Sequence, residues 1–456
     1  MSHTIGGSMI LKGIQGEVGM VPQASGLDEA EKSTPADGRL RVLCFTSLFP
    51  NSQLPRQGLF VRERVKALSK LCDVRVIAPV PWAPPTQWLG KRYYRYSQIE
   101  KIDYQDGLEV KHPRWIGIPK VFKTLDGLLM GMGSLASAVE LAQTIKFNII
   151  DAHWAYPDGV AAAILAKVLK LPLAITVRGD DINIFSHQLG RRQLIRWAFK
   201  TAGIVIALSE DLKEAVEALD IPASKVVVIP NGVDPNRFYP SDKTASRRRL
   251  GLPLEGRILL SVGRLHMSKG HPTLVEALAL IRDKFPDLTL YIVGDPDHEA
   301  DAKHEIEGLT ERYGLSGRVH IVKSQPPQVL ADWYRAADLF CLATSREGSA
   351  NVLLEALACG LPCITTPVGG NPMVLCDPEL GVLVPQDAHS IANTIVRCLA
   401  RNWDRDRIVA HAHNRTWRVV AEECYSHLSS IVTRAENIEF SLLPERADPD
   451  APGQRT

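Results

Sequence analysis

The sequence predicts an α/β protein built from two doubly wound parallel sheets. Short apolar runs of strand length alternate with helix-like segments in two series, one on each side of a Pro- and Gly-containing turn at residues 230–235. A chain of 456 residues, of which 45% are hydrophobic, is long enough for two or three domains with sizeable cores. Ligands of such sheets bind where the strands end, so we expect the functional residues in the turns that follow strands.

The first series predicts a domain over residues 40–232. Before it, residues 1–39 are rich in Gly, Ser and acidic residues and have no continuous apolar segment, which predicts a disordered leader and not a signal peptide. The predicted strands of this domain are 40–47, 73–78, 147–151, 173–177, 204–208 and 226–229, and the predicted helices are 60–71, 160–169 and 209–219.

The second series predicts a domain over residues 233–415. The turn at 230–235 contains two prolines and a glycine, which stop the preceding strand and mark a hinge. Beyond it, strand-like runs begin near residue 257 and continue at 288–293, 318–322, 338–342 and 362–365, and the pattern is helical from 387 to about 436. Residues 438–456 contain repeated Pro, Asp and Arg and are predicted to be a disordered tail.

Two carboxylates bracket the segment Glu-Gly-Ser-Ala-Asn-Val-Leu-Leu-Glu, which runs from Glu347 to Glu355. The segment follows an apolar run and opens a predicted helix that ends near Gly360. A strand that passes through a Gly-containing turn into a helix presents unpaired N–H groups and suits phosphate. The carboxylates suit hydroxyls instead, so the pattern indicates a nucleotide sugar. Each glutamate alone also fits an ordinary helix charge.

A second turn carries two cations. Arg264 and Lys269 lie between the strand-like run near 257 and a helix-like segment at 271–285. An Arg in such a turn can hold a phosphate through two hydrogen bonds, and a Lys acts as a point charge. As isolated residues the two would more often be ordinary surface charges.

Taken in order, these motifs resemble those of the family-4 retaining glycosyltransferases. The resemblance rests on Gly263-Arg264…Lys269-Gly270, Val293-Gly294-Asp295, the run 336–340, Ser345-Arg346-Glu347-Gly348…Glu355-Ala356 and the run 360–364. It extends from about residue 41 to about residue 399. It implies the GT-B fold, in which two Rossmann-like domains face each other across a cleft, with a helix at 416–437 that crosses back to the first domain.

The resemblance also implies roles for individual residues. Arg264 and Lys269 would neutralise the donor diphosphate, Glu355 would hold the ribose, and Glu347 would contact the donor sugar. The catalytic candidates are Arg264, Lys269, Glu347 and His153. No metal or cofactor is expected, because two cations and helix amides can stabilise a departing diphosphate. The predicted donor-binding residues are Gly58, Arg264, Lys269, Gly294, Glu347, Gly348, Ser349, Ala350 and Glu355.

The acceptor side is expected in the first domain. His153 and Trp154 follow the predicted strand 147–151, where a neutral imidazole could orient a sugar hydroxyl or share the proton of the acceptor. A core histidine bonded to backbone is the alternative. Arg178 and Asp180 follow the strand 173–177. Arg178 stands where many relatives have His, and it either binds an acceptor phosphate or pairs with Asp180.

Three further features of the sequence bear on this interpretation: Asp-x-Asp triplets, cysteines and surface charge. The Asp-x-Asp triplets at 295–297, 404–406 and 448–450 are interpreted as chance matches. The eight cysteines form no CxxC pair and are typical of reduced structural thiols in a cytoplasmic protein. The stretch 128–141 is too short and mixed for a spanning helix. The segments 91–96 and 115–123 interleave cations with aromatics, which fits a solvated loop or a peripheral contact with the inner face of the plasma membrane. No nucleic-acid motif accompanies them.

The sequence therefore predicts a metal-independent enzyme that transfers a hexosyl unit from a nucleoside diphosphate sugar to a lipid-linked glycan in cell-surface polysaccharide synthesis, such as exopolysaccharide or lipopolysaccharide. Retention of the anomeric configuration follows from the resemblance alone. No carboxylate nucleophile is assignable in the first half, so a same-face displacement is the working hypothesis. A nucleotide-sugar epimerase and a catalytically silent sugar-nucleotide-binding subunit are the alternatives.

Overall fold

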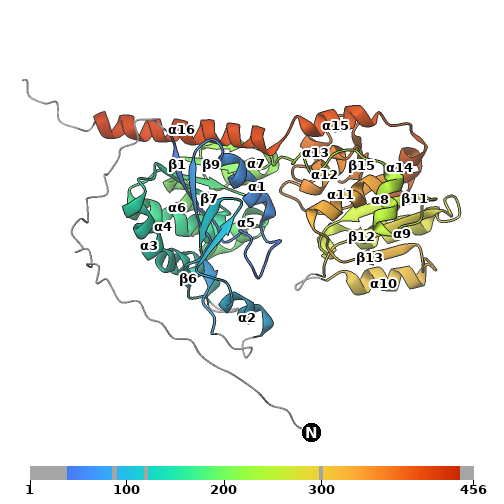
Figure 1. The fold of residues 1–456 in the computed structure, drawn as a ribbon, viewed down its shortest axis with the longest axis horizontal. Coiled ribbons are helices and arrows are strands. Elements are labelled where there is room, and N and C mark those ends of the chain that lie inside the picture. The colour runs from blue at the N-terminus through green and yellow to red at the C-terminus, as the bar shows by residue number, and fades with distance from the viewer. Residues whose placement is uncertain (1–38, 85–89, 118–121, 297–300, 442–456) are drawn as a thin grey trace, which may run out of the picture. The chain divides into compact units, whose positions relative to one another are not determined.

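The computed structural model describes residues 39–84, 90–117, 122–296 and 301–441 (Figure 1). The predicted leader and most of the predicted tail lie outside these residues. The chain from Leu40 onward forms one compact unit that contains two large sheets. Each sheet has helices packed on its two faces, as the alternating sequence pattern predicts.

The first sheet has eight strands in the order β10-β9-β8-β7-β1-β2-β5-β4. All its neighbours are parallel except the hairpin pair β4 and β5. A small separate pair, β3 and β6, extends the chain beyond the ends of β2 and β5. The strands are β1 Arg41–Phe45, β2 Asp73–Ile77, β3 Val80–Pro81, β4 Ile102–Gln105, β5 Leu108–Lys111, β6 Arg114–Trp115, β7 Ile149–His153, β8 Leu173–Thr176, β9 Ile204–Ala207 and β10 Val226–Val228.

The two faces of this sheet carry separate apolar cores. Alternate residues of a strand point to opposite faces, so Val42 and Cys44 of β1 pack in one core while Leu43 and Phe45 pack in the other. The helices of this half are α1 Leu59–Leu68, α2 Lys91–Ser97, α3 Asp126–Thr144, α4 Val160–Leu169, α5 Asp180–Asn183, α6 Leu189–Thr201 and α7 Glu210–Glu217.

The second sheet has six parallel strands in the order β13-β12-β11-β14-β15-β16. They are β11 Arg257–Val262, β12 Leu288–Val293, β13 Val319–Val322, β14 Leu339–Leu342, β15 Cys363–Thr365 and β16 Gly381–Leu383. The helices of this half are α8 Lys243–Leu250, α9 His271–Ile281, α10 Lys303–Arg312, α11 Pro327–Ala336, α12 Asn351–Ala358, α13 Asn371–Val374, α14 Ala388–Ala400 and α15 Arg405–His413.

The last helix, α16 Trp417–Ser441, packs on the first sheet's helix α1 (Figure 1). Val420, Cys424 and Leu428, which follow one another at a spacing of four residues, are buried in the same core as Val42 and Cys44. The segment before α16 pairs with the linker through the bridge between Val233 and Thr416. The helix continues to Ser441, past the predicted start of the tail at residue 438. The predicted domain boundaries at 232 and 415 stay predictions.

Helix α3 contains the stretch 128–141, which was not among the helices predicted from the sequence. Together with the turn before it, the segment Lys123–Thr144 is long and apolar enough by length and composition to cross a membrane, in contrast to the expectation for 128–141. One side of α3, including Met130, Gly131, Ser134, Ala138 and Leu141, is buried, and the helix packs against α4. A core helix of an α/β domain has this pattern.

Candidate active site

The turns after β11, β12 and β14 meet at the carboxyl edge of the second sheet. Gly270 has a φ of +68°, and a Cβ atom there would lie 1.8 Å from the carbonyl oxygen of Ala343, just after β14. A Cβ on Gly294, just after β12, would lie 1.8 Å from the carbonyl oxygen of Gly263, just after β11. Only glycine permits such contacts. The backbone therefore brings the predicted donor-site segments together.

Lys269 and Glu347 are in direct contact, although they are far apart in the sequence. The Lys269 Nζ atom donates a hydrogen bond to Oε1 of Glu347. Their side chains are only 20% and 12% exposed, so the pair is largely screened from water. Charges in such a setting interact more strongly than charges on an open surface. The structure thus unites one predicted cation and one predicted carboxylate in a single polar cluster.

Arg264 lies on the same turn, and its backbone is fixed by a buried histidine. The carbonyl oxygen of Arg264 lies 3.2 Å from Nε2 of His271, while Nδ1 of His271 lies 3.2 Å from the Ser261 hydroxyl. Burial lowers the pKa of His271 to about 4, so the ring is neutral at pH 7 and can donate to the carbonyl and accept from the hydroxyl. The Arg264 side chain itself is exposed.

Glu355 lies on the second turn of α12, and its carboxyl group is oriented by a tyrosine. The Tyr334 hydroxyl on α11 donates a hydrogen bond of 2.8 Å to Oε2 of Glu355. Burial raises the pKa of Glu355 to about 7, against the lowering effects of Tyr334 and of Arg237. The carboxyl is therefore partly protonated near neutral pH, and the tyrosine fixes the direction in which it points.

The residues before α12 contact the end of a strand in the first sheet. A Cβ on Gly348 would lie 2.0 Å from the carbonyl oxygen of Arg178, so only a residue without a side chain fits there. Beside Gly348, Ser349 has a buried hydroxyl without a hydrogen-bond partner among the described atoms, and Ala350 is buried at the start of α12. Asn231 of the linker donates a 2.9 Å hydrogen bond to Asn351, the first residue of α12.

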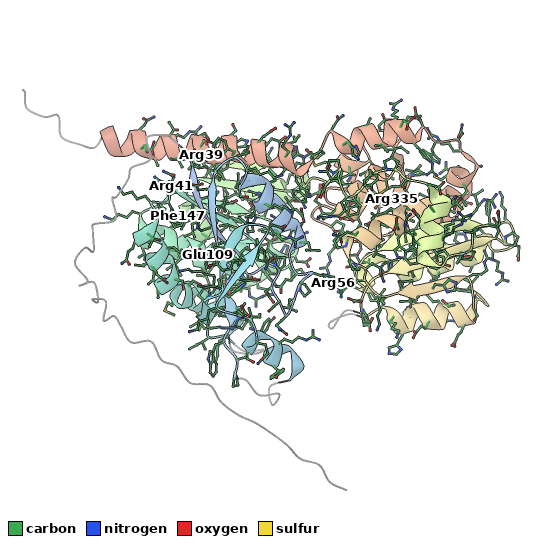
Figure 2. The ribbon with its side chains drawn as sticks, in the orientation of Figure 1. Arg39, Arg41, Arg56, Glu109, Phe147 and Arg335 are labelled. Carbon is green, nitrogen blue, oxygen red and sulfur yellow. The ribbon has the colours of Figure 1, made fainter. Side chains whose placement is uncertain are left out.

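Arg56 makes a further contact between segments distant in the sequence (Figure 2). Its guanidinium pairs with Asp295 at 3.2 Å and donates a 2.7 Å hydrogen bond to the carbonyl oxygen of Ser324. Asp295, the first residue of the Asp-x-Asp triplet 295–297, also accepts hydrogen bonds from Ser324. Within the described part of the chain, no three His, Cys, Asp or Glu residues are grouped as metal ligands. Residue 297 lies outside the described residues.

His153 ends β7 and is completely buried in a charged network. Nη2 of Arg178 donates to its Nδ1 at 2.8 Å, so the proton of the neutral ring is on Nε2, which lies 3.5 Å from Oδ2 of Asp151. Asp151 pairs in turn with Arg64, 3.2 Å away. Burial lowers the pKa of His153 well below its usual range, and the two arginines add to the effect. His153 is thus a neutral, oriented imidazole.

Arg178 does not pair with Asp180, so that predicted alternative was wrong. Its guanidinium contacts His153 and Asn231 and lies 4.9 Å from the centre of the Phe60 ring, while Asp180 is exposed. The reason is local. Gly179 turns the chain sharply, and the next carboxylate, Asp181, accepts hydrogen bonds from the backbone N–H groups of Arg178 and Gly179.

Trp154 and Gly58, the other two site residues predicted in the first half, make close contacts within the fold. Trp154 has a φ of 88° and its ring lies 6.1 Å from that of Phe185. A Cβ on Gly58, which has a φ of 65°, would lie 2.0 Å from the carbonyl oxygen of Leu48. This close approach requires glycine whether or not a ligand binds next to it.

Tyr334, His271 and the pair formed by Arg64 and Asp151 were not predicted from the sequence. His271 directly follows Lys269-Gly270 and begins a helix, so its position beside a predicted ligand turn was a usable signal. Tyr334 and Arg64 lie on helices whose pattern indicates only burial. Their partners are 21 and 87 residues away, a distance at which sequence spacing predicts no contact.

Comparison with known proteins identifies the family. Residues 57–237 match Glycosyltransferase Family 4, and residues 242–415 match Glycosyl transferases group 1. TuaC of Bacillus subtilis (strain 168), a glycosyltransferase assigned to teichuronic acid biosynthesis, is 30% identical over 410 residues, which are 87% of this chain and 96% of TuaC. The chain belongs to the family-4, group 1 glycosyltransferases.

Other glycosyltransferases of known sequence or structure are also similar. The D-inositol 3-phosphate glycosyltransferase of Corynebacterium efficiens is 31% identical over 67% of this chain and 75% of its own length. Sucrose-phosphate synthase from Thermosynechococcus elongatus has a TM-score of 0.64 at 22% identity, over 88% of this glycosyltransferase and 99% of that chain. Anabaena Alr3699/HepE, solved with UDP and glucose, has a TM-score of 0.60 at 22% identity. The match covers 89% of this glycosyltransferase and 100% of that chain. The two solved structures establish the GT-B fold.

Proposed function

We propose that this glycosyltransferase moves a hexosyl unit from a nucleoside diphosphate sugar to a lipid-linked glycan during cell-surface polysaccharide synthesis. The observation that carries the proposal is the cluster at the carboxyl edge of the second sheet. There Lys269 contacts Glu347. Glu355 lies on the second turn of α12, and its carboxyl accepts a hydrogen bond from Tyr334. Cations, helix-start amides and oriented carboxylates together suit a diphosphate flanked by sugar hydroxyls.

In the proposed reaction Lys269 and Arg264 stabilise the diphosphate as it leaves, which is the step in which negative charge develops. Glu347 contacts the donor sugar, and Glu355 accepts hydrogen bonds from the ribose hydroxyls. His153 orients a hydroxyl and does not act as a strong base, because Nδ1 already accepts from Arg178 and Nε2 carries the proton. The two cations and the amides would supply the charge stabilisation that a metal supplies in other enzymes.

The comparisons support the substrate classes. TuaC, which this chain matches over nearly the whole of its length, is assigned by its name to teichuronic acid biosynthesis. The HepE structures contain UDP, glucose and UDP-glucose. We infer a sugar nucleotide as donor and a growing surface polysaccharide as acceptor. The direct contact between Lys269 and Glu347 argues against the silent-subunit alternative, since it keeps both chemical groups in place.

The proposal is tested with purified protein and a panel of nucleoside diphosphate sugars. We expect one donor to raise the melting temperature selectively, in the presence of EDTA as well as without it, and that donor to be consumed when a glycan acceptor is added. NMR of the product should show the anomeric configuration of the donor. A new sugar nucleotide formed without acceptor would indicate the epimerase, and a shift without consumption of the donor would favour the silent subunit. No shift with any donor would overturn the proposal.

We expect donor affinity to increase about tenfold between pH 6 and pH 8. The pKa of Glu355, raised to about 7 by burial, means that its carboxyl is mostly protonated at pH 6 and mostly ionised at pH 8. Because ribose hydroxyls donate to the ionised form, the donor should bind more tightly as the pH rises. The bound diphosphate diester has no ionisation near neutral pH. Calorimetric titration with the donor selected from the panel at a series of pH values measures the effect.

The Glu355→Gln variant is the control for this pH dependence. Burial also raises the pKa of Asp158 to about 7, and that group is present in both proteins. Glu63 and Arg237, the charged groups that influence Glu355, are likewise retained. The variant should bind the donor with nearly constant affinity between pH 6 and pH 8. A slope equal to that of the wild type would assign the titration to a different group.

A further inference from the structure

Nine large apolar side chains are exposed on the described residues of the first half, and five of them lie close in sequence to β3, β6 and the starts of α3 and α6, outside the candidate active site. Leu189 is 84% exposed and Phe122 is 68% exposed. Single exposed apolar residues are common on soluble proteins, but groups of them mark interaction sites. We name this group the apolar rim, and its members are Trp82, Ile116, Phe122, Leu125 and Leu189.

The topology places the apolar rim at one edge of the first sheet. Trp82 and Ile116 follow β3 and β6, which extend the chain beyond the carboxyl ends of β2 and β5. Phe122 and Leu125 lie at the start of α3, and Leu189 begins α6. Each of these helices returns the chain to the next parallel strand, so its first residues lie at the edge where the strands end. His153 ends its strand at this same edge.

Contacts between the segments support this arrangement. The backbone N–H of Trp82 donates to the carbonyl oxygen of Trp115, next to Ile116, at 2.7 Å. A Cβ on Gly133 of α3 would lie 2.7 Å from Cβ of Trp115, and a Cβ on Gly190 would lie 2.6 Å from the methyl group of Thr124. The three segments are therefore joined by direct packing. Trp115 itself is buried, so Ile116, and not Trp115, is exposed in this part of the segment 115–123 that was predicted to contact a membrane.

Cations lie among and beside these apolar side chains. Lys123 is between Phe122 and Leu125 and pairs with the buried Asp126. Arg191 follows Leu189 by two residues and lies 4.6 Å from the centre of the Phe185 ring. Arg95 is exposed on α2, and neither Arg95 nor Arg191 belongs to an ion pair among the described residues. Aromatic and aliphatic side chains bordered by basic groups suit the boundary between acyl chains and anionic headgroups.

We propose that the apolar rim inserts into the surface of an anionic lipid bilayer. This placement rests on the proposed function, because it would bring the edge that carries His153 next to the membrane from which a lipid-linked acceptor is presented. Arg95 and Arg191, which belong to no ion pair among the described residues, favour a bilayer over a second copy of the chain. Self-association would need only apolar contact, and the basic groups beside the two apolar rims would repel each other.

The test is flotation of the full chain with two kinds of vesicle, phosphatidylcholine alone and phosphatidylcholine mixed with phosphatidylglycerol. We expect binding to the mixed vesicles and little to the neutral ones. The variant Phe122→Ser/Leu189→Ser should bind the mixed vesicles at least about tenfold more weakly. The control is Leu254→Ser/Leu280→Ser, which changes two leucines of the second half that are 45% and 50% exposed and should bind as the wild type does.

Donor binding separates this proposal from the proposed function. Both variants should keep the melting-temperature shift produced by the selected sugar nucleotide. Vesicle binding that is lost in the Phe122→Ser/Leu189→Ser variant, in a protein that binds no sugar nucleotide, would retain the apolar rim and overturn the proposed function. Vesicle binding equal in all three proteins, or absent from the wild type, would overturn the apolar rim. A wild-type dimer that the same variant converts to a monomer, without vesicle binding, would make a second copy the occupant.

Discussion

Replacing Lys269 with alanine is expected to reduce sugar transfer by about 10²–10³-fold while the protein remains folded. Its Nζ atom contacts Glu347 in a largely buried setting, where a positive charge interacts strongly with the charge that develops on the leaving diphosphate. The substitution removes that charge and leaves Glu347 without its partner. Initial rates of transfer with the selected donor, measured at saturating donor, report the loss in the chemical step.

The matched control for Lys269 is Lys303→Ala on α10. Lys303 also pairs with a glutamate, Glu307 at 3.6 Å, but its side chain is 43% exposed. We expect its loss to leave transfer within about twofold, because exposed pairs of this kind contribute little. The variant Lys269→Arg should recover only part of the activity, since a planar guanidinium does not replace a point charge. A Lys269→Ala enzyme as active as the Lys303→Ala control would exclude Lys269 from the proposed chemistry.

The central strands were the part of the fold that the sequence predicted best. The predicted strand 288–293 coincides with β12, and the predicted helix 160–169 coincides with α4. Strands buried on both faces are continuous apolar runs, which are readable without knowledge of their neighbours. The predicted helix 271–285 ends earlier, at Ile281, because element ends depend on tertiary contacts.

The peripheral elements were missed although some of their signals are present. The hairpin of β4 and β5 turns at Asp106-Gly107, both with positive φ, and Asp-Gly is a strong hairpin signal. Helix α6 buries Ile195, Ala198 and Phe199 at helical spacing, but its other residues are mostly polar. Short edge elements such as these have too few apolar residues to be distinct in the sequence.

The candidate site could be predicted only as a set of segments. Gly-containing turns after strands indicated where Lys269, Glu347 and Glu355 lie, because parallel strands bring their carboxyl ends together. The partners of these residues depend on side-chain packing across the fold, and no spacing indicates them. Thus one of the two alternatives for Arg178, the pair with Asp180, was wrong, since Gly179 redirects the chain and leaves the guanidinium beside His153. Its binding of an acceptor phosphate stays a prediction.

Replacing Arg64 with methionine is expected to lower the free energy of unfolding by about 3–5 kcal/mol. The Arg64 and Asp151 side chains are 2% and 1% exposed, and Arg64 also donates a 2.8 Å hydrogen bond to Thr176. Methionine fills much of the same space but leaves the Asp151 carboxylate buried without its cation. Burial already raises the pKa of Asp151, and Arg64 opposes that effect, so the variant should favour the protonated acid still more. Urea unfolding followed by tryptophan fluorescence measures the change.

A second pair of variants shows whether the effect comes from the unpaired charge. Arg64→Met/Asp151→Asn should recover part of the lost stability, because the neutral amide costs less to bury than the carboxylate. The exposed pair of Arg257 and Asp287, at 44% and 41% exposure, is the control, and Arg257→Met should cost less than about 1 kcal/mol. The pair near His153 would then be the rigid support that fixes the imidazole at the end of β7. Equal losses for Arg64→Met and Arg257→Met would show instead that the buried network contributes no more than a surface contact.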